Sequence, residues 1–265
     1  MAIKEVVRIA AVSDLHYSRT TAPGSLQPLF AQITESADVF VMCGDSTDYG
    51  LAEEARAFVK EFTATVKIPT VSVLGNHDFE SGQQDEIRRI LTDAGITVLD
   101  GDTTEILGVG FAGVKGFAGG FGRRALGPWG EDIIKKFVHE AVDEALKLES
   151  ALARLRTDRL VAVLHYSPIQ STVEGEPPEI FPFLGCSRLE DPLTRFPVSA
   201  VFHGHAHHGR PEGRTRNNVP VFNVSISLMR EVSPDRPFRL VELGPAAAAA
   251  AERRTGSDRR AAEVR

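Results

Sequence analysis

Short apolar runs separated by polar turns constrain the fold of this 265-residue chain more than any other feature. The runs are continuously hydrophobic rather than alternating, which is typical of β-strands covered on both faces. Between several of them, apolar residues recur at three- and four-residue spacing, which predicts amphipathic helices. The predicted strands are 6–12, 39–43, 70–74, 108–114, 160–164, 200–202, 219–224 and 238–243, and the predicted helices are 26–37, 51–65, 84–94 and 131–157.

The order of these elements predicts the architecture. Strands and helices alternate early and the second half is rich in strands, which predicts an α/β sandwich with parallel and antiparallel pairing. We expect one domain over residues 1–244. The Gly-rich segment 116–130 is predicted to be a long loop that either caps a site or forms a solvated insertion. The low-complexity segment 245–265 lacks a packable apolar face and is predicted to be disordered and dispensable for activity.

Composition and charge exclude several classes of protein. The hydrophobic content of 42% and charged content of 25% are close to the globular average. A net charge of -6 argues against binding of extended nucleic acid. The N-terminus lacks a signal peptide and no apolar run reaches the roughly 18 residues of a membrane span, so we expect a cytoplasmic protein without a membrane partner. Cys43 and Cys186 are expected to be reduced thiols.

Side chains that can bind a metal ion follow five of the predicted strands. Carboxyl ends of strands are where ligand sites form in open α/β sheets, so we expect these side chains to lie close together. A glycine within three of these stretches lets the backbone turn sharply as it leaves the strand. The five stretches are SDLH, GDSTD, GNHD, HYSP and HGHAH.

The spacing and number of these side chains indicate a centre for two metal ions. Asp14 and His16 are two residues apart, as are His205 and His207, so in extended backbone each pair points the same way. The seven candidates exceed what one ion needs and match two ions that share a carboxylate and activate a bridging water. Oxygen and imidazole ligands suit Mn, Fe, Zn or Co. The seven candidates are Asp14, His16, Asp45, Asn76, His165, His205 and His207.

The motifs D-x-H, G-D-x-x-D, G-N-H-D, a single histidine and G-H-x-H occur in this order between residues 13 and 207. This series resembles that of the calcineurin-like metallophosphoesterase family. The resemblance implies a four-layer αββα sandwich with mixed sheets. It also implies a phosphoric ester hydrolase that uses a water or hydroxide bridging two divalent or trivalent metal ions, with a small phosphate ester as substrate.

The resemblance further implies a role for each candidate. His77 would be an acid near the leaving group. One ion would be held by Asp14, His16 and His207, the other by Asn76, His165 and His205, and Asp45 would bridge both.

Other polar residues close to the motifs are weaker candidates. Asp48 and Asp78 are available to orient imidazoles, and we count Asp48 with His77 among the catalytic residues, whereas Asp78 fits a turn-forming carboxylate equally well. His203 either contacts substrate or packs at the end of a strand. Arg123 and Arg124 of the long loop are further candidates for substrate binding.

One departure from the motifs predicts the type of ester. Related protein phosphatases have Arg-Gly after the second motif, and that arginine helps to hold a phosphate dianion. Here Tyr49 takes its place, so we expect phosphodiesters to be preferred unless Arg123 or Arg124 replaces the missing charge.

The alternatives to a phosphodiesterase are a phosphomonoesterase of the same mechanism and a noncatalytic scaffold. A purple-acid-type enzyme would have tyrosine where this chain has Asp48. Nothing in the sequence identifies the physiological substrate, the native metals or the oligomeric state.

Overall fold

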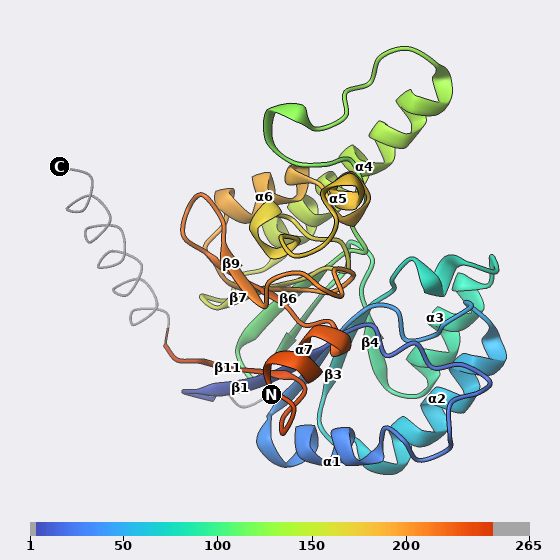
Figure 1. Ribbon diagram of the computed structural model, residues 1–265. Helices are drawn as coiled ribbons and strands as arrows, with labels where there is room; N and C mark the ends of the chain where they lie inside the picture. The colour runs from blue at the N-terminus through green and yellow to red at the C-terminus, as the bar shows by residue number, and fades with distance from the viewer. Residues whose placement is uncertain (1–3, 246–265) are drawn as a thin grey trace.

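The computed structural model describes residues 4–245, so the predicted tail from residue 246 onward lies outside the described residues. Within this range, two mixed β-sheets pack face to face and helices cover both outer faces (Figure 1). The arrangement is the predicted four-layer αββα sandwich.

The first sheet is parallel except at one edge. β1 pairs antiparallel with β11, and the other neighbours pair parallel. The carboxyl ends of β1, β2 and β3 therefore lie on one edge of the sheet. The strand order is β11 (Arg239–Leu243), β1 (Val7–Val12), β2 (Val39–Cys43), β3 (Thr70–Val73) and β4 (Ile96–Val98).

The second sheet is parallel in its centre and antiparallel at both edges. β6, β7, β8 and β10 pair parallel, whereas β5 and β9 pair antiparallel with their neighbours. The strand order is β5 (Thr103–Ile106), β6 (Val109–Gly113), β7 (Leu160–Val163), β8 (Val198–His203), β10 (Pro220–Asn223) and β9 (Glu212–Arg214).

Helices lie on both outer sides of the sandwich, as Figure 1 shows. α1 (Gln27–Ser36), α2 (Ala52–Thr65) and α3 (Gln84–Asp93) flank the first sheet. α4 (Asp132–Arg154) and α6 (Glu190–Arg195) flank the second. The shorter elements are the helices α5 (Phe181–Leu184) and α7 (Ile226–Val232) and the 3₁₀ turns η1 (His77–Phe79), η2 (Gly122–Arg124), η3 (Gln170–Thr172), η4 (Pro178–Ile180) and η5 (Ser187–Leu189).

Three layers of apolar contacts explain the continuous hydrophobicity of the strands. Phe40 and Met42 of β2 pack against the helices, whereas Val41 between them packs against the second sheet. β7 does the same, with Val161 facing the first sheet and Ala162 facing α4. Because alternate residues of one strand enter different cores, both faces must be apolar.

The elements that the sequence did not predict are short or lie at sheet edges. β4 has three residues, and β5 and β9 are edge strands whose side chains are mainly half-buried or exposed. α7 has seven residues, too few for a clear helical period. In contrast, the four predicted helices were all confirmed within a few residues of their predicted ends.

The sequence also predicted that segment 116–130 forms a long loop and that both cysteines are reduced thiols. Segment 116–130 contains the short turn η2, and Phe117 packs on Phe137 with ring centroids 4.9 Å apart. Figure 1 shows the rest of this loop extending beyond the sandwich together with the start of α4. Cys43 and Cys186 are buried free thiols. Among the described helices, none combines the length and the hydropathy needed to cross a bilayer.

Arg159 connects separate segments at the amino end of β7. This residue is 6% exposed, and its guanidinium donates hydrogen bonds to main-chain carbonyl oxygens rather than to carboxylates. These contacts hold the start of β1, the β5–β6 turn and the end of β11 together. The acceptors belong to Lys4, Glu5, Leu107, Gly108 and Leu243.

We predict that Arg159→Met lowers the free energy of unfolding by about 2–4 kcal/mol, because several buried carbonyl groups lose their partner. Arg156→Met is the matched control, since this exposed arginine donates only to nearby carbonyls, and its effect should be within about 0.5 kcal/mol. Urea denaturation measures both. Equal effects of the two substitutions would contradict the role of Arg159.

Candidate metal centre

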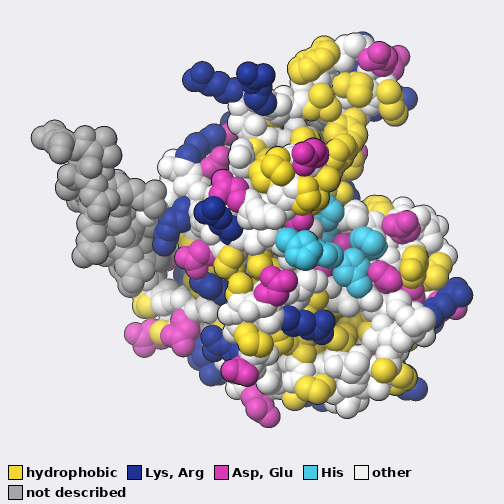
Figure 2. All heavy atoms as spheres, viewed as in Figure 1, with side chains coloured by type: hydrophobic (Ala, Val, Ile, Leu, Met, Phe, Trp, Pro, Cys, Tyr) yellow, Lys and Arg dark blue, Asp and Glu magenta, His cyan; other side chains and the backbone are white. Residues whose placement is uncertain are grey.

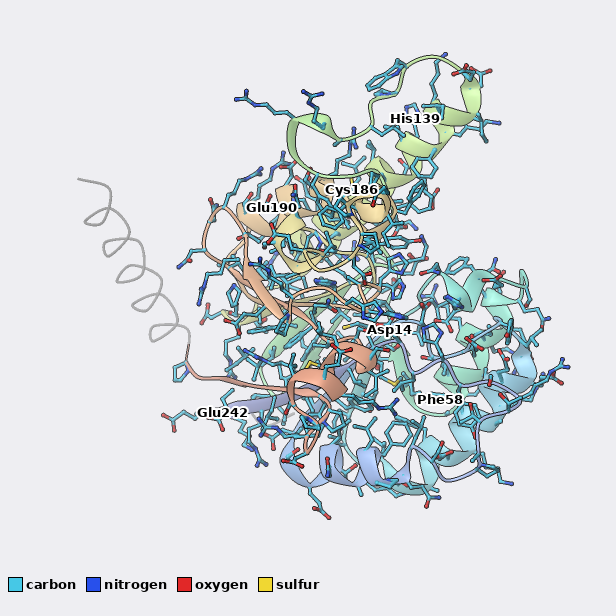
Figure 3. All side chains as sticks on the ribbon, in the orientation of Figure 1. Asp14, Phe58, His139, Cys186, Glu190 and Glu242 are labelled. Atoms are coloured by element: carbon cyan, nitrogen blue, oxygen red, sulfur yellow. The ribbon has the colours of Figure 1, made fainter. Side chains whose placement is uncertain are left out.

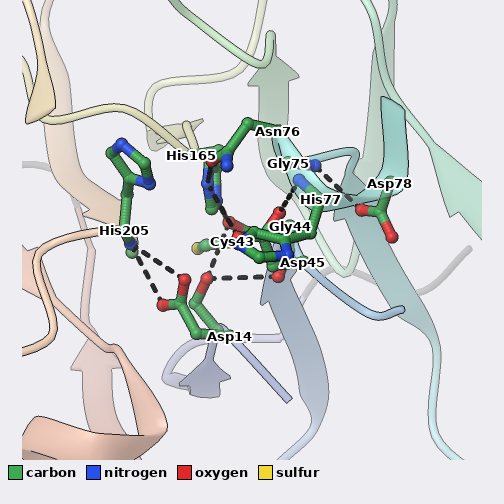
Figure 4. A network of polar contacts seen from close by, with 12 residues as sticks. Asp14, Cys43, Gly44, Asp45, Gly75, Asn76, His77, Asp78, His165 and His205 are labelled. Atoms are coloured by element: carbon green, nitrogen blue, oxygen red, sulfur yellow. Dashed lines mark hydrogen bonds and ion pairs between the residues drawn. The ribbon is translucent and has the colours of Figure 1, made fainter. Parts of the chain in front are cut away.

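Five strand ends bring metal-capable side chains to one edge of the sandwich. β1 is followed by Asp14 and His16, β2 by Asp45, and β3 by Asn76 and His77. From the second sheet, β7 is followed by His165 and β8 by the loop that carries His205 and His207. Figure 4 shows six of these side chains converging from both sheets, namely Asp14, Asp45, Asn76, His77, His165 and His205.

The first group consists of Asp14, His16 and His207. Their potential ligand atoms all lie within 4.8 Å of one another. Nε2 of His207 is 3.4 Å from Oδ1 of Asp14, and the rings of His16 and His207 have centroids 5.4 Å apart. These are the three residues that the family resemblance assigns to one ion.

The second group consists of Asp45, His165 and His205, again with ligand atoms within 4.8 Å. Nε2 of His165 lies 3.3 Å from Oδ2 of Asp45 and 2.8 Å from Oδ1 of Asn76. The structure therefore brings Asn76 to the same place, and this set matches the one that the resemblance assigns to the other ion.

Asp45 lies between the two groups. Its Oδ2 is 3.3 Å from Nε2 of His165 and 4.0 Å from Nε2 of His16, while its Oδ1 accepts a hydrogen bond from the backbone N–H of His77 at 2.8 Å. His16, Asp45 and His77 also form a third group that meets the same distance condition. Asp45 is thus placed where a carboxylate shared by two ions would have to be.

Main-chain carbonyls fix the orientation of three imidazoles. Nδ1 of His165 is 2.8 Å from the carbonyl oxygen of Cys43, Nε2 of His205 is 3.2 Å from that of Phe183, and Nδ1 of His77 is 2.6 Å from that of Asp48. A carbonyl can only accept, so the facing nitrogen carries the hydrogen and the other nitrogen is left for a ligand.

The side chain of Asp48 contacts His16, as its predicted orienting role requires. Its Oδ1 lies 3.3 Å from Nδ1 of His16. Neither nitrogen of His16 makes a hydrogen bond within the described residues, although both are buried. Buried nitrogen atoms without a partner are costly in a purely structural histidine, whereas a metal ligand needs one such atom.

The backbone adopts an unusual conformation at four of the candidate ligands. Asp14, His16, Asp45 and His205 have φ of 60°, 45°, 51° and 69°, in the left-handed region that residues with a Cβ rarely occupy. Such strain clusters at functional sites. The sequence predicted that Asp14 and His16, and likewise His205 and His207, point the same way from extended backbone. The positive φ values show that left-handed turns bring these side chains together instead.

Two of the motif glycines are required by close packing rather than by a positive φ. A Cβ at Gly75 would lie 2.1 Å from Oδ1 of Asp45, and a Cβ at Gly204 would lie 2.5 Å from Oδ2 of Asp14. Each glycine thus gives a carboxylate the space it needs. The prediction that both glycines serve as sharp turns was incomplete.

Charge in the centre is divided unequally among the histidines. Burial alone would lower the pKa of His165, but the charge and hydrogen bond of Asp45 outweigh it and raise the pKa to about 9. Burial lowers the pKa of His205 to about 4, so this imidazole is neutral at pH 7. Burial would raise the pKa of Asp14, but the contact with His207 and the charge of His165 hold it below its usual value. Neutral imidazoles and ionised carboxylates are the forms that bind metals, so His165 has to release a proton when it becomes a ligand.

The surroundings of His203 favour one of its two predicted alternatives. This last residue of β8 is fully buried, and its ring nitrogens lie 2.8 Å from the carbonyl oxygen of Gly204 and 2.8 Å from Oγ1 of Thr172. Neither nitrogen is available to a substrate. Burial lowers its pKa to about 4. His203 is therefore packed at the strand end, which was the other alternative.

Asp78 and the loop arginines also lie outside the cluster. Asp78 accepts hydrogen bonds from the backbone of Thr47 and Gly75 and from the Thr47 hydroxyl, as expected of a turn-forming carboxylate. Arg123 and Arg124 are exposed in η2, and within the described residues neither makes a hydrogen bond or ion pair. The structure does not bring them to the candidate ligands.

The clustered histidines and His139 lie in different parts of the surface. The cluster lies on one face, in a hollow between the two halves of the surface (Figure 2). His139 is exposed on α4, away from Asp14 (Figure 3). The sequence did not single out Tyr166, whose ring centroid is 4.5 Å from that of His205, and its position beside His165 was the available indication.

The donor set fits a pair of divalent ions. It combines buried carboxylates, imidazoles already oriented by carbonyls, and orphaned nitrogens of His16. Oxygen and nitrogen ligands without thiolate are typical of Mn, Fe, Zn and Co in hydrolytic centres.

Comparison with known proteins agrees with this geometry. The model of the calcineurin-like phosphoesterase family matches residues 7–209. No curated protein sequence matches the chain significantly.

Several solved structures are similar in fold. A phosphopantetheinyl hydrolase from Mycobacterium tuberculosis has a TM-score of 0.64 and 17% identity, covering 88% of this chain and 95% of its own. A protein from Thermus thermophilus has a TM-score of 0.52 and 15% identity, covering 90% and 99%. A protein named as a putative 5′-nucleotidase from Staphylococcus aureus, in complex with α-ketoglutarate, has a TM-score of 0.51 and 16% identity, covering 82% and 48%. At these identities the likeness shows the fold.

We predict that the wild-type chain binds two Mn²⁺ ions and that Asp45→Ala binds neither tightly, because this carboxylate lies between both groups. His77→Ala should retain both ions. Equilibrium dialysis against Mn²⁺ gives the stoichiometry. Loss of an ion in His77→Ala would instead make His77 a ligand, as its membership in the third group allows.

Proposed function

Because this chain belongs to the calcineurin-like phosphoesterase family, we propose that it is a metal-dependent phosphoric ester hydrolase that prefers small phosphodiesters. The position of Asp45 between two groups of candidate ligands carries this proposal. Mn, Fe, Zn or Co would occupy the centre. The net charge of -6 supports a small substrate rather than extended nucleic acid.

The residues of the centre would divide the work of binding. Asp14, His16 and His207 would hold one ion, and His165, His205 and Asn76 the other, with Asp45 shared. When bound, the two ions supply a hydroxide nucleophile at neutral pH and neutralise charge on the phosphoryl oxygens. Asp48 keeps the imidazole of His16 in place through the contact with Nδ1.

His77 is placed to move a proton. Its Nδ1 donates to the carbonyl oxygen of Asp48, so a proton for the leaving oxygen would be carried on Nε2. Its backbone N–H holds Asp45, which ties the position of the acid to that of the shared carboxylate. His77 is half-buried, which keeps the ring accessible from the hollow.

The surroundings of the carboxylates favour a diester over a monoester. Within residues 4–245, no lysine or arginine forms an ion pair with Asp14, Asp45 or Asp48, whose neighbouring basic side chains are histidines. Tyr49, at the position of the phosphatase arginine, is 59% exposed. A monoester dianion would lack a bidentate cationic partner, whereas a diester monoanion needs less positive charge.

We predict that the Mn²⁺-loaded protein hydrolyses bis(p-nitrophenyl) phosphate with a higher kcat/KM than p-nitrophenyl phosphate. For the monoester, one missing charge-assisted hydrogen bond costs about 1.5–3 kcal/mol, which corresponds to a roughly 10- to 150-fold lower kcat/KM. Activity should disappear with a chelator and return with Mn²⁺.

Two results would contradict this prediction in different ways. A clear preference for the monoester would identify a phosphomonoesterase. Absence of turnover of either ester by protein that binds two ions would favour a noncatalytic scaffold.

We predict that His77→Ala lowers kcat by about 10²-fold or more while KM changes little, because general acids contribute about that much. The loss should be smaller for esters with a more acidic leaving alcohol, since these need less protonation. The series of leaving groups is therefore the control. A loss that is independent of the leaving group would rule out the proposed acid.

A further inference from the structure

A cavity of about 160 Å³ lies between the segments that follow β3, β4 and β6 and the helices α3 and α4. Leu74 and Phe79 form part of its wall, and α4 contributes Glu144 and Lys147. Phe79 lies in η1, the same 3₁₀ turn as His77, so the cavity wall and the proposed acid belong to one short segment. An engineered cavity of about 150 Å³ holds benzene, so this one has room for a group of similar size.

Lys115 supplies a positive charge to this cavity. It follows β6 and is partly buried. Its Nζ lies 4.8, 5.3 and 5.5 Å from the ring centroids of Phe117, Tyr166 and Phe79. Its hydrogen bond goes to the adjacent carbonyl of Gly116 at 2.8 Å, and in the described part of the chain no carboxylate pairs with it. An ammonium has three donors, so two are left for a ligand.

The other cations of the cavity already have carboxylate partners. Lys147 is 2.7 Å from Glu144 and 3.1 Å from Asp100. Arg88 is 2.8 Å from Asp102 and 3.9 Å from Asp100. The remaining lining carboxylates, Asp85 and Glu140, are exposed to solvent, which screens their charge.

Tyr166 connects Lys115 to the candidate ligands. Its ring centroid is 4.5 Å from that of His205 and 5.3 Å from Nζ of Lys115. In addition, the carbonyl oxygen of Lys115 accepts hydrogen bonds from the backbone N–H groups of His165 and Tyr166, both at 3.0 Å. The ammonium therefore lies one aromatic ring away from the centre.

We propose that Lys115 binds a second anionic group, a phosphate or a carboxylate, on the leaving part of the substrate. This inference rests on the proposed phosphoesterase function. The leaving part is favoured because Phe79 of the cavity wall shares η1 with His77, the proposed acid for the leaving oxygen. Aromatic walls reduce local screening, so a charge pair formed there is stronger than one in open solvent. The preferred ester then carries one negative charge at the scissile phosphate and another on the leaving group.

Three methyl aryl phosphodiesters test the inference. Their leaving rings carry a carboxylate, a phosphonate or a neutral carboxamide at the same position. We expect the wild type to prefer the charged esters and Lys115→Met to lower kcat/KM for them by about 10- to 100-fold, with the carboxamide changed less than about 2-fold. Lys115→Arg should keep the preference. Lys60→Met, which removes an exposed lysine of α2, should behave as wild type. Whichever of the two charged esters has the higher kcat/KM shows whether Lys115 binds a carboxylate or a phosphate-like group.

A binding measurement separates this inference from the proposed function. The product 3-hydroxyphenylphosphonate should bind the metal-free wild type by calorimetry and bind Lys115→Met at least about 10-fold more weakly. If the wild type hydrolyses no ester, the proposed function fails and this measurement decides the role of Lys115. Equal loss of kcat/KM for all three esters, or equal binding by both proteins, would overturn the inference.

Discussion

The left-handed backbone at the ends of β1, β2 and β8 is the constraint on which the rest of the centre depends. A strand that ended in ordinary extended conformation would carry the carboxylates of Asp14 and Asp45 away from each other. The turns point them toward the histidines of the opposite sheet. Strain of this kind persists only where the surrounding structure holds it, and here two apolar sheet faces and helices on both sides provide that rigidity.

The candidate metal ligands and the stabilising contacts of Arg159 lie at opposite edges of the sandwich because of the direction of the strands. The candidate ligands lie at the carboxyl ends of the parallel strands, whereas Arg159 joins segments at the opposite edge, where β1 and β7 begin and the antiparallel β11 ends. The parallel core strands run between these two edges. As a result, the edge with the costly backbone conformations is not the edge at which the first and last strands of the domain are tied together.

The pattern of buried strands predicted an α/β sandwich and the ordered motifs identified the clustered side chains, whereas the four layers were implied by the family resemblance. The sequence could not predict how the side chains meet. Alternation along a strand placed His203 on the side of His205, but the extended backbone ends at His203 and His205 has a φ of 69°. Edge strands such as β9 escaped notice because solvent-facing residues carry no apolar period. The cavity lined by Lys115 is formed by segments far apart in the chain, so no local sequence pattern predicts it.

Lys115 contacts its surroundings in two chemically separate ways. The backbone N–H groups of His165 and Tyr166 are held by its carbonyl oxygen, a group that every amino acid possesses, while its side chain carries the ammonium. Exchange of this one side chain would therefore leave the support of His165 intact.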